Sequence, residues 1–103
     1  MKQQQQATGG SAVVTNNEAR SRYELQQDGE VAAIAQYEVD GDRVRFTHTE
    51  VDQRYEGQGL GSKLAASALD DVKRRGMKAL PQCKFIASYI ARHEKEYGEL
   101  VVS

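Results

Sequence analysis

The sequence predicts one mixed α/β (α+β) domain whose elements follow the order β-β-β-α-β-α. Two features indicate this fold class. Two Asp-Gly turns separate three β-favouring runs, and the apolar spacing then changes to that of an α-helix after residue 59. A chain of 103 residues can build one hydrophobic core and is too short for a second. We expect residues 18–103 to form this domain and residues 1–17, which have little to bury, to form a disordered tail.

The composition argues against several classes of partner. Hydrophobic residues make up 39% of the chain and charged residues 28%, which is ordinary for a soluble globular protein. The formal net charge of -1 argues against nucleic acid and anionic membranes as partners. No apolar run approaches the roughly 20 residues of a membrane span, and the first ten residues lack the apolar core of a signal peptide. We expect a cytoplasmic protein that is a monomer or weak homodimer and, with one cysteine and two histidines, binds no metal.

The three expected strands occupy residues 22–27, 30–39 and 43–51. Short turns join them at Asp28-Gly29 and around Gly41. Asp-Gly sequences favour hairpins because they tolerate the positive φ angles that match the twist of the flanking strands. The pattern therefore predicts three consecutive antiparallel strands.

A helix is expected over residues 60–76, followed by a short strand at 77–83 and a second helix at 84–101. The first helix has an apolar face made of Leu60, Leu64, Ala65, Ala68, Leu69 and Val72. Gly76 follows a basic last turn and is typical of a helix C-terminus. A strand-helix-strand connection of this length forms a right-handed crossover, so strand 77–83 should pair in parallel with strand 43–51.

Three glycines, Gly57, Gly59 and Gly61, lie between the third strand and the first helix. A helix N-terminus has unpaired N–H groups and the positive end of the helix dipole, so this position suits an anion. Without Cβ atoms, the glycines allow a phosphate to approach the backbone amides. The spacing matches neither a P-loop nor the dinucleotide-binding fingerprint. The sequence therefore predicts a phosphate-binding loop of another type.

The run RYEGQG at residues 54–59 resembles the acetyl-CoA loop of the GNAT superfamily of N-acetyltransferases, whose pattern is Gln/Arg-x-x-Gly-x-Gly/Ala. Together with PQC at residues 81–83, YIARH at 89–93 and Tyr97, it is similar to a small single-domain GNAT-like family. The resemblance covers roughly residues 23–102 and implies a GNAT-like mixed sheet, truncated relative to full-size GNATs. The helical segment that usually follows their first strand is replaced here by the Asp28-Gly29 turn.

The resemblance implies that acetyl-CoA is the cosubstrate and that backbone amides near the glycines bind its pyrophosphate, with charge supplied by Arg54 and Lys63. It also implies a strand bulge near residues 49–51, which frees amides for the pantetheine arm or the acetyl oxygen. The cofactor-binding residues expected on this basis are Val51, Arg54, Glu56, Gly57, Gln58, Gly59, Leu60, Gly61, Ser62 and Lys63. The basic run at residues 73–75 is either a solvated last turn or a contact for the CoA 3′-phosphate.

The third strand supplies two candidates for a general base. Val44, Phe46, His48 and Glu50 alternate along the strand and are predicted to share one face by period two. His48 or Glu50 could take a proton from an amine, directly or through water. The alternative is that both are polar groups at a strand end with structural roles.

Cys83 and Tyr89 are the other catalytic candidates. Cys83 ends the fourth strand just before a helix N-terminus, where the dipole favours a thiolate. It could accept the acetyl group, protonate the departing CoA thiolate, or act as a small buried hydrophobe. Tyr89 occupies a position where larger GNATs often place a general acid, and it also continues the apolar face of the second helix.

These features predict an acetyl-CoA-dependent N-acetyltransferase that acts on an unidentified amine. The alternative is a non-catalytic CoA-binding or protein-interaction module on the same fold, because the segment that helps to build the acceptor site is missing. A nucleic-acid binder is disfavoured, since basic and aromatic residues are not interleaved along the chain.

Overall fold

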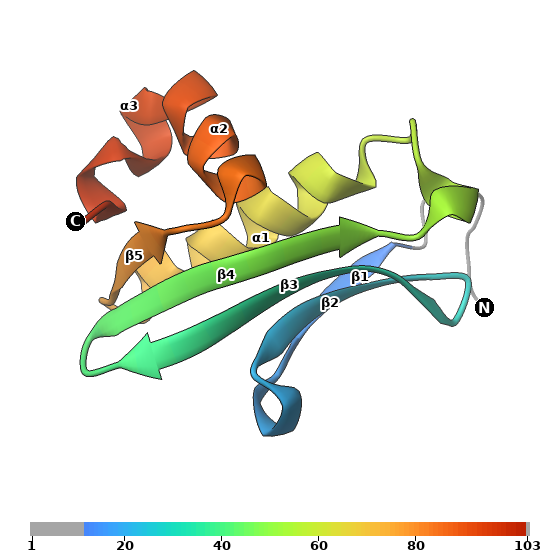
Figure 1. Ribbon diagram of the computed structural model, residues 1–103, viewed down its shortest axis with the longest axis horizontal. Coiled ribbons are helices and arrows are strands. Elements are labelled where there is room, and N and C mark those ends of the chain that lie inside the picture. The colour runs from blue at the N-terminus through green and yellow to red at the C-terminus, as the bar shows by residue number, and fades with distance from the viewer. Residues whose placement is uncertain (1–11, 103) are drawn as a thin grey trace.

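The computed structural model describes residues 12–102, which form a mixed sheet with helices packed on one of its faces (Figure 1). Strands β1 to β5 are Val13–Asn17, Arg22–Gln27, Glu30–Asp40, Arg43–Val51 and Lys78–Pro81. Helices α1 to α3 are Leu60–Arg74, Lys84–Arg92 and Glu94–Tyr97, and the 3-10 turns η2 to η4 are Glu18–Arg20, Gln53–Tyr55 and Gly98–Leu100. The strands lie in the order β1-β2-β3-β4-β5, with only the β4–β5 pair parallel. The predicted hairpins, crossover helix and parallel strand are confirmed.

Strand β1 lies where the sequence suggests a disordered tail, so that expectation is wrong for residues 13–17. Val14 stands opposite Leu25 of β2 and packs against the core. The Tyr37 hydroxyl donates a hydrogen bond of 2.6 Å to Asn16 Oδ1. The Val-Val-Thr run has the β-branched side chains that strands favour, and the polar residues around it hide this signal. The rest of the expected tail, residues 1–11, lies outside the described residues.

The extra strand changes which connection follows the first strand. The chain passes from β1 to β2 through η2, closed by Ser21 at a φ of 53°. The Asp28-Gly29 turn joins β2 to β3 instead. The helical segment that full-size GNATs carry after their first strand would therefore fall at residues 18–21 and not at the Asp28-Gly29 turn, which corrects the expectation above.

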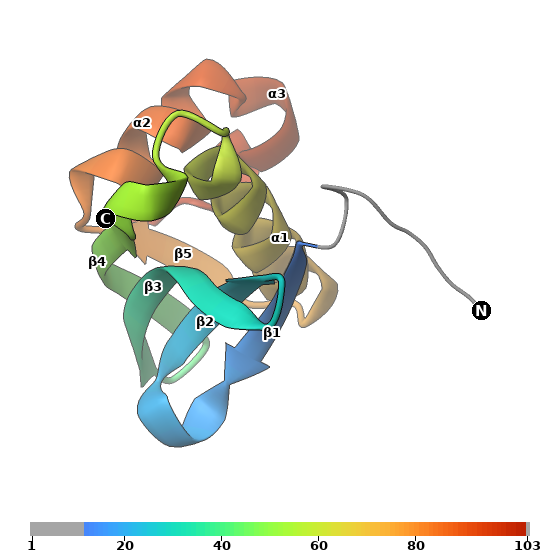
Figure 2. The ribbon, with the colours of Figure 1, turned by 90° about the vertical axis from the view of Figure 1, so that its right-hand side faces the viewer.

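The helices cover a single face of the sheet, which we call the inner face (Figures 1 and 2). α1 packs across the strands, and α2 packs beside it over β4 and β5. The predicted apolar face of α1 is buried, and it meets inward side chains of the sheet that include Leu25, Val44 and Phe46. The Tyr97 hydroxyl donates a 2.8 Å hydrogen bond to Asp70 and holds α3 against α1. None of the described helices is long and apolar enough to span a membrane.

A β-bulge in β4 lies at Thr47. Phe46 and His48 pair with consecutive residues of β3, so Thr47 is an extra residue between them. The prediction of a bulge at residues 49–51 is therefore wrong in position. An extra residue shifts the side-chain alternation by one, so every side chain that follows it changes face.

The bulge decides which side chains of β4 reach the inner face. Before it, Phe46 is fully buried in the core. After it, Val51 packs against the core and Thr49 contacts the side chain of Cys83. His48 and Glu50 are exposed on the opposite face of the sheet, which we call the outer face. The prediction that His48 and Glu50 share a face with Phe46 is wrong, because period-two alternation is interrupted at Thr47.

The second predicted helix, residues 84–101, is interrupted at His93, which joins α2 to α3 with a ψ of 42°. His93 Nδ1 lies 2.9 Å from the carbonyl oxygen of Tyr89, and the His93 backbone N–H bonds to Ile90 instead. In a continuous α-helix the backbone N–H of His93 would bond to the Tyr89 carbonyl. Here the His93 imidazole bonds to that carbonyl, and α2 ends. Beyond η4, Val101 forms a parallel bridge beside β5.

Glu24 is a buried carboxylate on the outer face of the sheet. Arg22 Nε donates a hydrogen bond of 2.7 Å to it, and Asn17 Nδ2 donates one of 3.1 Å. The hydrogen bond from Arg22 lowers the pKa of Glu24 below its ordinary 4.5, although burial opposes this. Because the folded pKa lies below the unfolded one, the carboxylate stabilises the fold fully above pH 4.5, and this contribution is lost as the pH falls through the folded value.

We expect Glu24→Gln to lower the free energy of unfolding at neutral pH by about 1–2 kcal/mol, because it removes a charge-assisted hydrogen bond. The variant should also lose less stability than the wild type on acidification from about pH 5 to pH 3. Urea unfolding at a series of pH values measures both effects. Parallel stability curves for the two proteins would contradict this role of Glu24.

Candidate functional site

A pocket of about 270 Å³, which we call the glycine pocket, opens where β4 ends and α1 begins. It is lined by Val51, Tyr55, Glu56, Gly57, Gly59, Leu60, Gly61, Ser62 and Phe85. These residues come from the end of β4, the loop at 52–59, the first turn of α1 and the first turn of α2. Seven of the ten residues predicted to bind a cofactor are among them. The fold therefore gathers most of the predicted loop residues around one hollow.

The three glycines of the loop have two different roles. Gly57 and Gly59 have φ angles of 84° and 75°, in the left-handed region that other residues rarely adopt. A Cβ atom at either would meet nothing within 4 Å, so both border open space. A Cβ atom at Gly61 would lie 2.7 Å from Cζ of Phe85. Gly61 therefore allows the first turns of α1 and α2 to touch, a role different from the predicted path for a phosphate.

The N-terminus of α1 presents unpaired backbone donors to this pocket. Gly59 is the N-cap and provides no side-chain cap. The N–H of Lys63 bonds to the Gly59 carbonyl at 3.2 Å, so the N–H groups of the three preceding residues have no partner within the helix. The lining includes one carboxylate, Glu56, and no lysine or arginine. An anion in this pocket would therefore be held by backbone N–H groups and the dipole of a 15-residue helix.

Three predicted cofactor-binding residues, Arg54, Gln58 and Lys63, are exposed and lie outside the pocket lining. Arg54 donates to both carboxylate oxygens of Asp52 at 3.2 Å, and its Nη2 lies 3.0 Å from Glu30 Oε1. The hydrogen bonds from Arg54 lower the pKa of Asp52 below its ordinary value. The guanidinium is thus already paired with two carboxylates.

β5 separates from β4 before β4 ends, and this leaves a gap between them. Their pairing stops at Phe46 and Pro81, after which the chain turns into α2. Backbone groups point alternately to the two edges of a strand. The Asp52 N–H bonds to β3 at 2.8 Å, so the N–H groups of Val51 and Thr49 point to the other edge, which β5 has left. The rest of β4 therefore offers backbone donors to the gap.

Cys83 and Thr49 face each other at this gap, with Sγ and Oγ1 3.1 Å apart. Cys83 is partly buried and is the N-cap of α2. Its backbone N–H bonds to the Phe46 carbonyl at 3.0 Å, which fixes it at the point where the strands separate. The structure therefore gives Cys83 a hydroxyl partner and places it beside the free edge of β4.

His48 and Glu50 form a pair on the outer face, with Nε2 and Oε2 3.3 Å apart. Their side chains are 52% and 69% exposed. A hydrogen-bonded carboxylate holds an imidazole ring in one orientation. The structure brings these two candidates together, on the opposite side of β4 from Thr49 and Cys83.

Tyr89 is buried between α2 and α3 and does not line the pocket. Its ring stacks on His93 at a centroid distance of 4.1 Å and lies 6.0 Å from Tyr97. Burial raises the pKa of the Tyr89 hydroxyl. These contacts match the packing role that was the alternative to a general acid.

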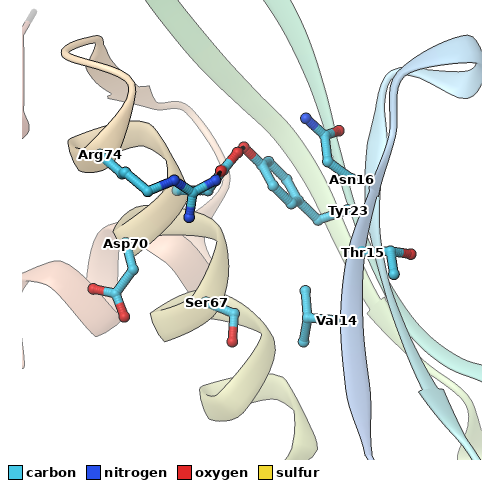
Figure 3. A pocket seen from close by; sticks show the side chains of 8 residues that line it. Val14, Thr15, Asn16, Tyr23, Ser67, Asp70 and Arg74 are labelled. Atoms are coloured by element: carbon cyan, nitrogen blue, oxygen red, sulfur yellow. Dashed lines mark hydrogen bonds and ion pairs between the residues drawn. The ribbon is translucent and has the colours of Figure 1, made fainter.

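A larger hollow of about 400 Å³ lies between β1 and α1 (Figure 3) and contains none of the predicted catalytic or cofactor-binding residues. Tyr23 and Arg74 extend toward each other across it, and both bond to Asp71. Burial and the 2.6 Å hydrogen bond to Asp71 raise the pKa of Tyr23. The basic run at residues 73–75 belongs to this end of α1, roughly 20 Å along the helix from the glycine pocket. This position favours a solvated last turn over a contact for the 3′-phosphate.

Three residues at the site were not singled out from the sequence: Thr49, Tyr55 and Phe85. Thr49 reaches the gap only because of the bulge at Thr47, which no spacing rule reveals. Phe85 matches the apolar period of the second helix, yet the residue is 36% exposed and lines the pocket. Tyr55 lies inside the glycine motif, and its position there was the one available signal.

Solved structures with a similar fold include acetyltransferases. A GCN5-like protein from Staphylococcus aureus superposes with a TM-score of 0.65 at 21% identity, covering 91% of both chains. The ribosomal-protein-S18-alanine N-acetyltransferase from Escherichia coli gives 0.59 at 26% identity, covering 86% of this chain and 54% of that one. The fold is therefore that of the GNAT acetyltransferases.

The family model described as GCN5-related N-acetyl-transferase matches residues 22–100. This chain belongs to the GCN5-related N-acetyltransferase family. Protein NATD1 of Mus musculus is 34% identical over 84 residues, which cover 80% of this chain and 76% of the relative. Protein NATD1 of Homo sapiens is 41% identical over 59 residues, which cover 56% of this chain and 52% of the relative.

Proposed function

We propose that this protein is an acetyl-CoA-dependent N-acetyltransferase that transfers the acetyl group to an amine. One observation carries the proposal. The glycine pocket lies at the end of β4, beyond the point where β5 separates from that strand. Val51 lines this pocket and also belongs to the free edge of the strand. A ligand with an anionic part and an extended amide-containing arm would match both features.

The pocket supplies a site for the pyrophosphate of CoA. The N–H groups of Leu60, Gly61 and Ser62 have no partner within α1, and Gly57 and Gly59 leave open space in front of them. The amide groups of the pantetheine arm would pair with β4 as a neighbouring strand does, through the free N–H groups of residues 49 and 51. This arrangement would bring the thioester toward Cys83.

The chemistry requires a neutral amine and a donor for the oxygen of the tetrahedral intermediate. The amine would approach from the outer face, where His48 takes its proton and Glu50 stabilises the resulting imidazolium. The amine nitrogen bonds to the acetyl carbon, the carbon–sulfur bond breaks, and the leaving thiolate receives a proton. Cys83 could supply that proton, or its thiolate could accept the acetyl group first and pass it to the amine.

A non-catalytic CoA-binding or interaction module is the second candidate. It is favoured by the short η2 connection after β1, which leaves the outer face without a covering helix among residues 12–102. Calorimetry with acetyl-CoA followed by mass spectrometry of an amine panel separates the two. Binding without any acetylated amine would support the module, and one robust acetylated product would exclude it.

The route through Cys83 has its own expected result. If the acetyl group passes through the thiol, wild-type protein incubated with acetyl-CoA alone gains the mass of one acetyl group, and Cys83→Ala does not. Intact-mass analysis before and after hydroxylamine, which cleaves thioesters, measures this. An unmodified wild-type protein that still acetylates amines would establish direct transfer instead.

A further inference from the structure

Arg54 stands at the centre of a small cluster that joins the loop at 52–59 to the start of β3. It donates two hydrogen bonds of 3.2 Å to Asp52 and lies 3.0 Å from Glu30. Its guanidinium carbon lies 5.4 Å from the centre of the Tyr55 ring, and the Tyr55 hydroxyl donates to Glu30 at 3.3 Å. Asp52 also caps η3 by accepting the Arg54 backbone N–H at 2.9 Å. These contacts connect Asp52, Arg54 and Tyr55 to one another, and they connect Arg54 and Tyr55 to Glu30.

The charges of this cluster do not favour an anion. One guanidinium and two carboxylates have a formal net charge of -1, and Arg54 does not line the glycine pocket. To bind a phosphate, the side chain would have to leave both carboxylates. Arg54 is instead placed to hold Tyr55, which does line the pocket, and the two glycines that follow it.

We infer that Arg54 is a positioning residue, which fixes the glycine loop through Glu30 and Asp52, and not a ligand of the CoA phosphates. The inference rests on the proposed binding of acetyl-CoA to this pocket. Glu30 follows the Asp28-Gly29 turn, so the β2–β3 hairpin becomes part of the support of the cofactor loop. This role differs from the one that the family resemblance implied, in which Arg54 supplies charge near the pyrophosphate.

The two roles predict opposite changes in the affinity for acetyl-CoA when Glu30 is replaced by glutamine. Glu30→Gln keeps the size of the side chain and an acceptor for Tyr55. If Arg54 positions the loop, the variant loosens it and acetyl-CoA binds about threefold more weakly. If Arg54 binds a phosphate, removing a competing carboxylate frees the guanidinium, and acetyl-CoA binds more tightly. Titration calorimetry of the full chain with acetyl-CoA measures the sign.

Two further measurements complete the test. Arg54→Gln should weaken binding about tenfold, and adding Glu30→Gln to it should have no further effect, because both act through one cluster. Without ligand, the amides of residues 56–59 should exchange with deuterium faster in Glu30→Gln than in the wild type. Glu38→Gln is the matched control, since it breaks the ion pair of Glu38 in β3 with Arg45 in β4, which lies outside the loop at 52–59.

The exchange measurement keeps the inference separable from the proposed function. A wild-type protein that does not bind acetyl-CoA overturns the proposed function, and faster loop exchange in Glu30→Gln then still supports the positioning role. Tighter binding in Glu30→Gln, or loop exchange equal to that of the wild type, overturns the inference about Arg54.

Discussion

Gly59→Val is expected to raise the dissociation constant for acetyl-CoA at least about 100-fold while the protein remains folded. The φ of 75° at this position strains any β-branched residue, at a cost of about 1–3 kcal/mol. A Cβ atom there would have no protein atom within 4 Å, so the substitution begins in open space. The new side chain would occupy the space in front of the free N–H groups of α1, where the pyrophosphate is proposed to lie. Titration calorimetry measures the change.

Gly41→Val separates backbone strain from the loss of the site. Gly41 has a φ of 64° and also has nothing within 4 Å of a built Cβ, but it lies in the β3–β4 hairpin, outside the pocket lining. The two variants should lose similar stability in urea, and only Gly59→Val should lose binding. Equal affinities of the two variants for acetyl-CoA would contradict the proposed pyrophosphate site in the glycine pocket.

His48→Gln is expected to reduce kcat by about 10²- to 10⁴-fold, the usual contribution of a general base. The dissociation constant for acetyl-CoA should stay near the wild-type value, because His48 is on the outer face and does not line the glycine pocket. The loss of rate on acidification that an imidazole base causes in the wild type should also disappear. Steady-state kinetics over a pH series, with an amine found in the panel, measures these effects.

Two variants act as controls for His48→Gln. Glu50→Gln keeps a partner for the imidazole but removes its negative charge, so it should give a smaller loss of kcat, about tenfold. His93→Gln changes the other histidine, which bonds to Tyr89 where α2 ends. It should alter stability and leave the pH profile unchanged. A pH profile for His48→Gln that matches the wild type would exclude His48 as the base.

The sequence predicted the parts of this fold that depend on local patterns. The apolar face of α1 follows directly from a period of 3.6, and the Asp28-Gly29 turn has a backbone requirement that few dipeptides meet. The position of the glycine loop between a strand and a helix was also predicted, because Gly57 and Gly59 interrupt one pattern just where the next begins. These signals need no knowledge of distant residues.

The features that the sequence did not predict depend on contacts between distant segments. Nothing in RVRFTHTEV marks Thr47 as an extra residue, since the bulge exists only relative to the pairing with β3. That single residue reversed the predicted faces of His48 and Glu50. The family resemblance implied a charge from Arg54 near the pyrophosphate, and the ion pair with Glu30 could not be predicted because the two residues are far apart in the sequence.

The bulge at Thr47 also affects how this chain is compared with its relatives. In an alignment without a gap at Thr47, a relative with a regular strand would have every later β4 position matched to a side chain of the opposite face. His48 would then be scored against a core position, and Thr49 against a solvent position. A substitution rate measured at those columns would mix two environments, so the strand must be compared in two segments, with one position left unmatched between them.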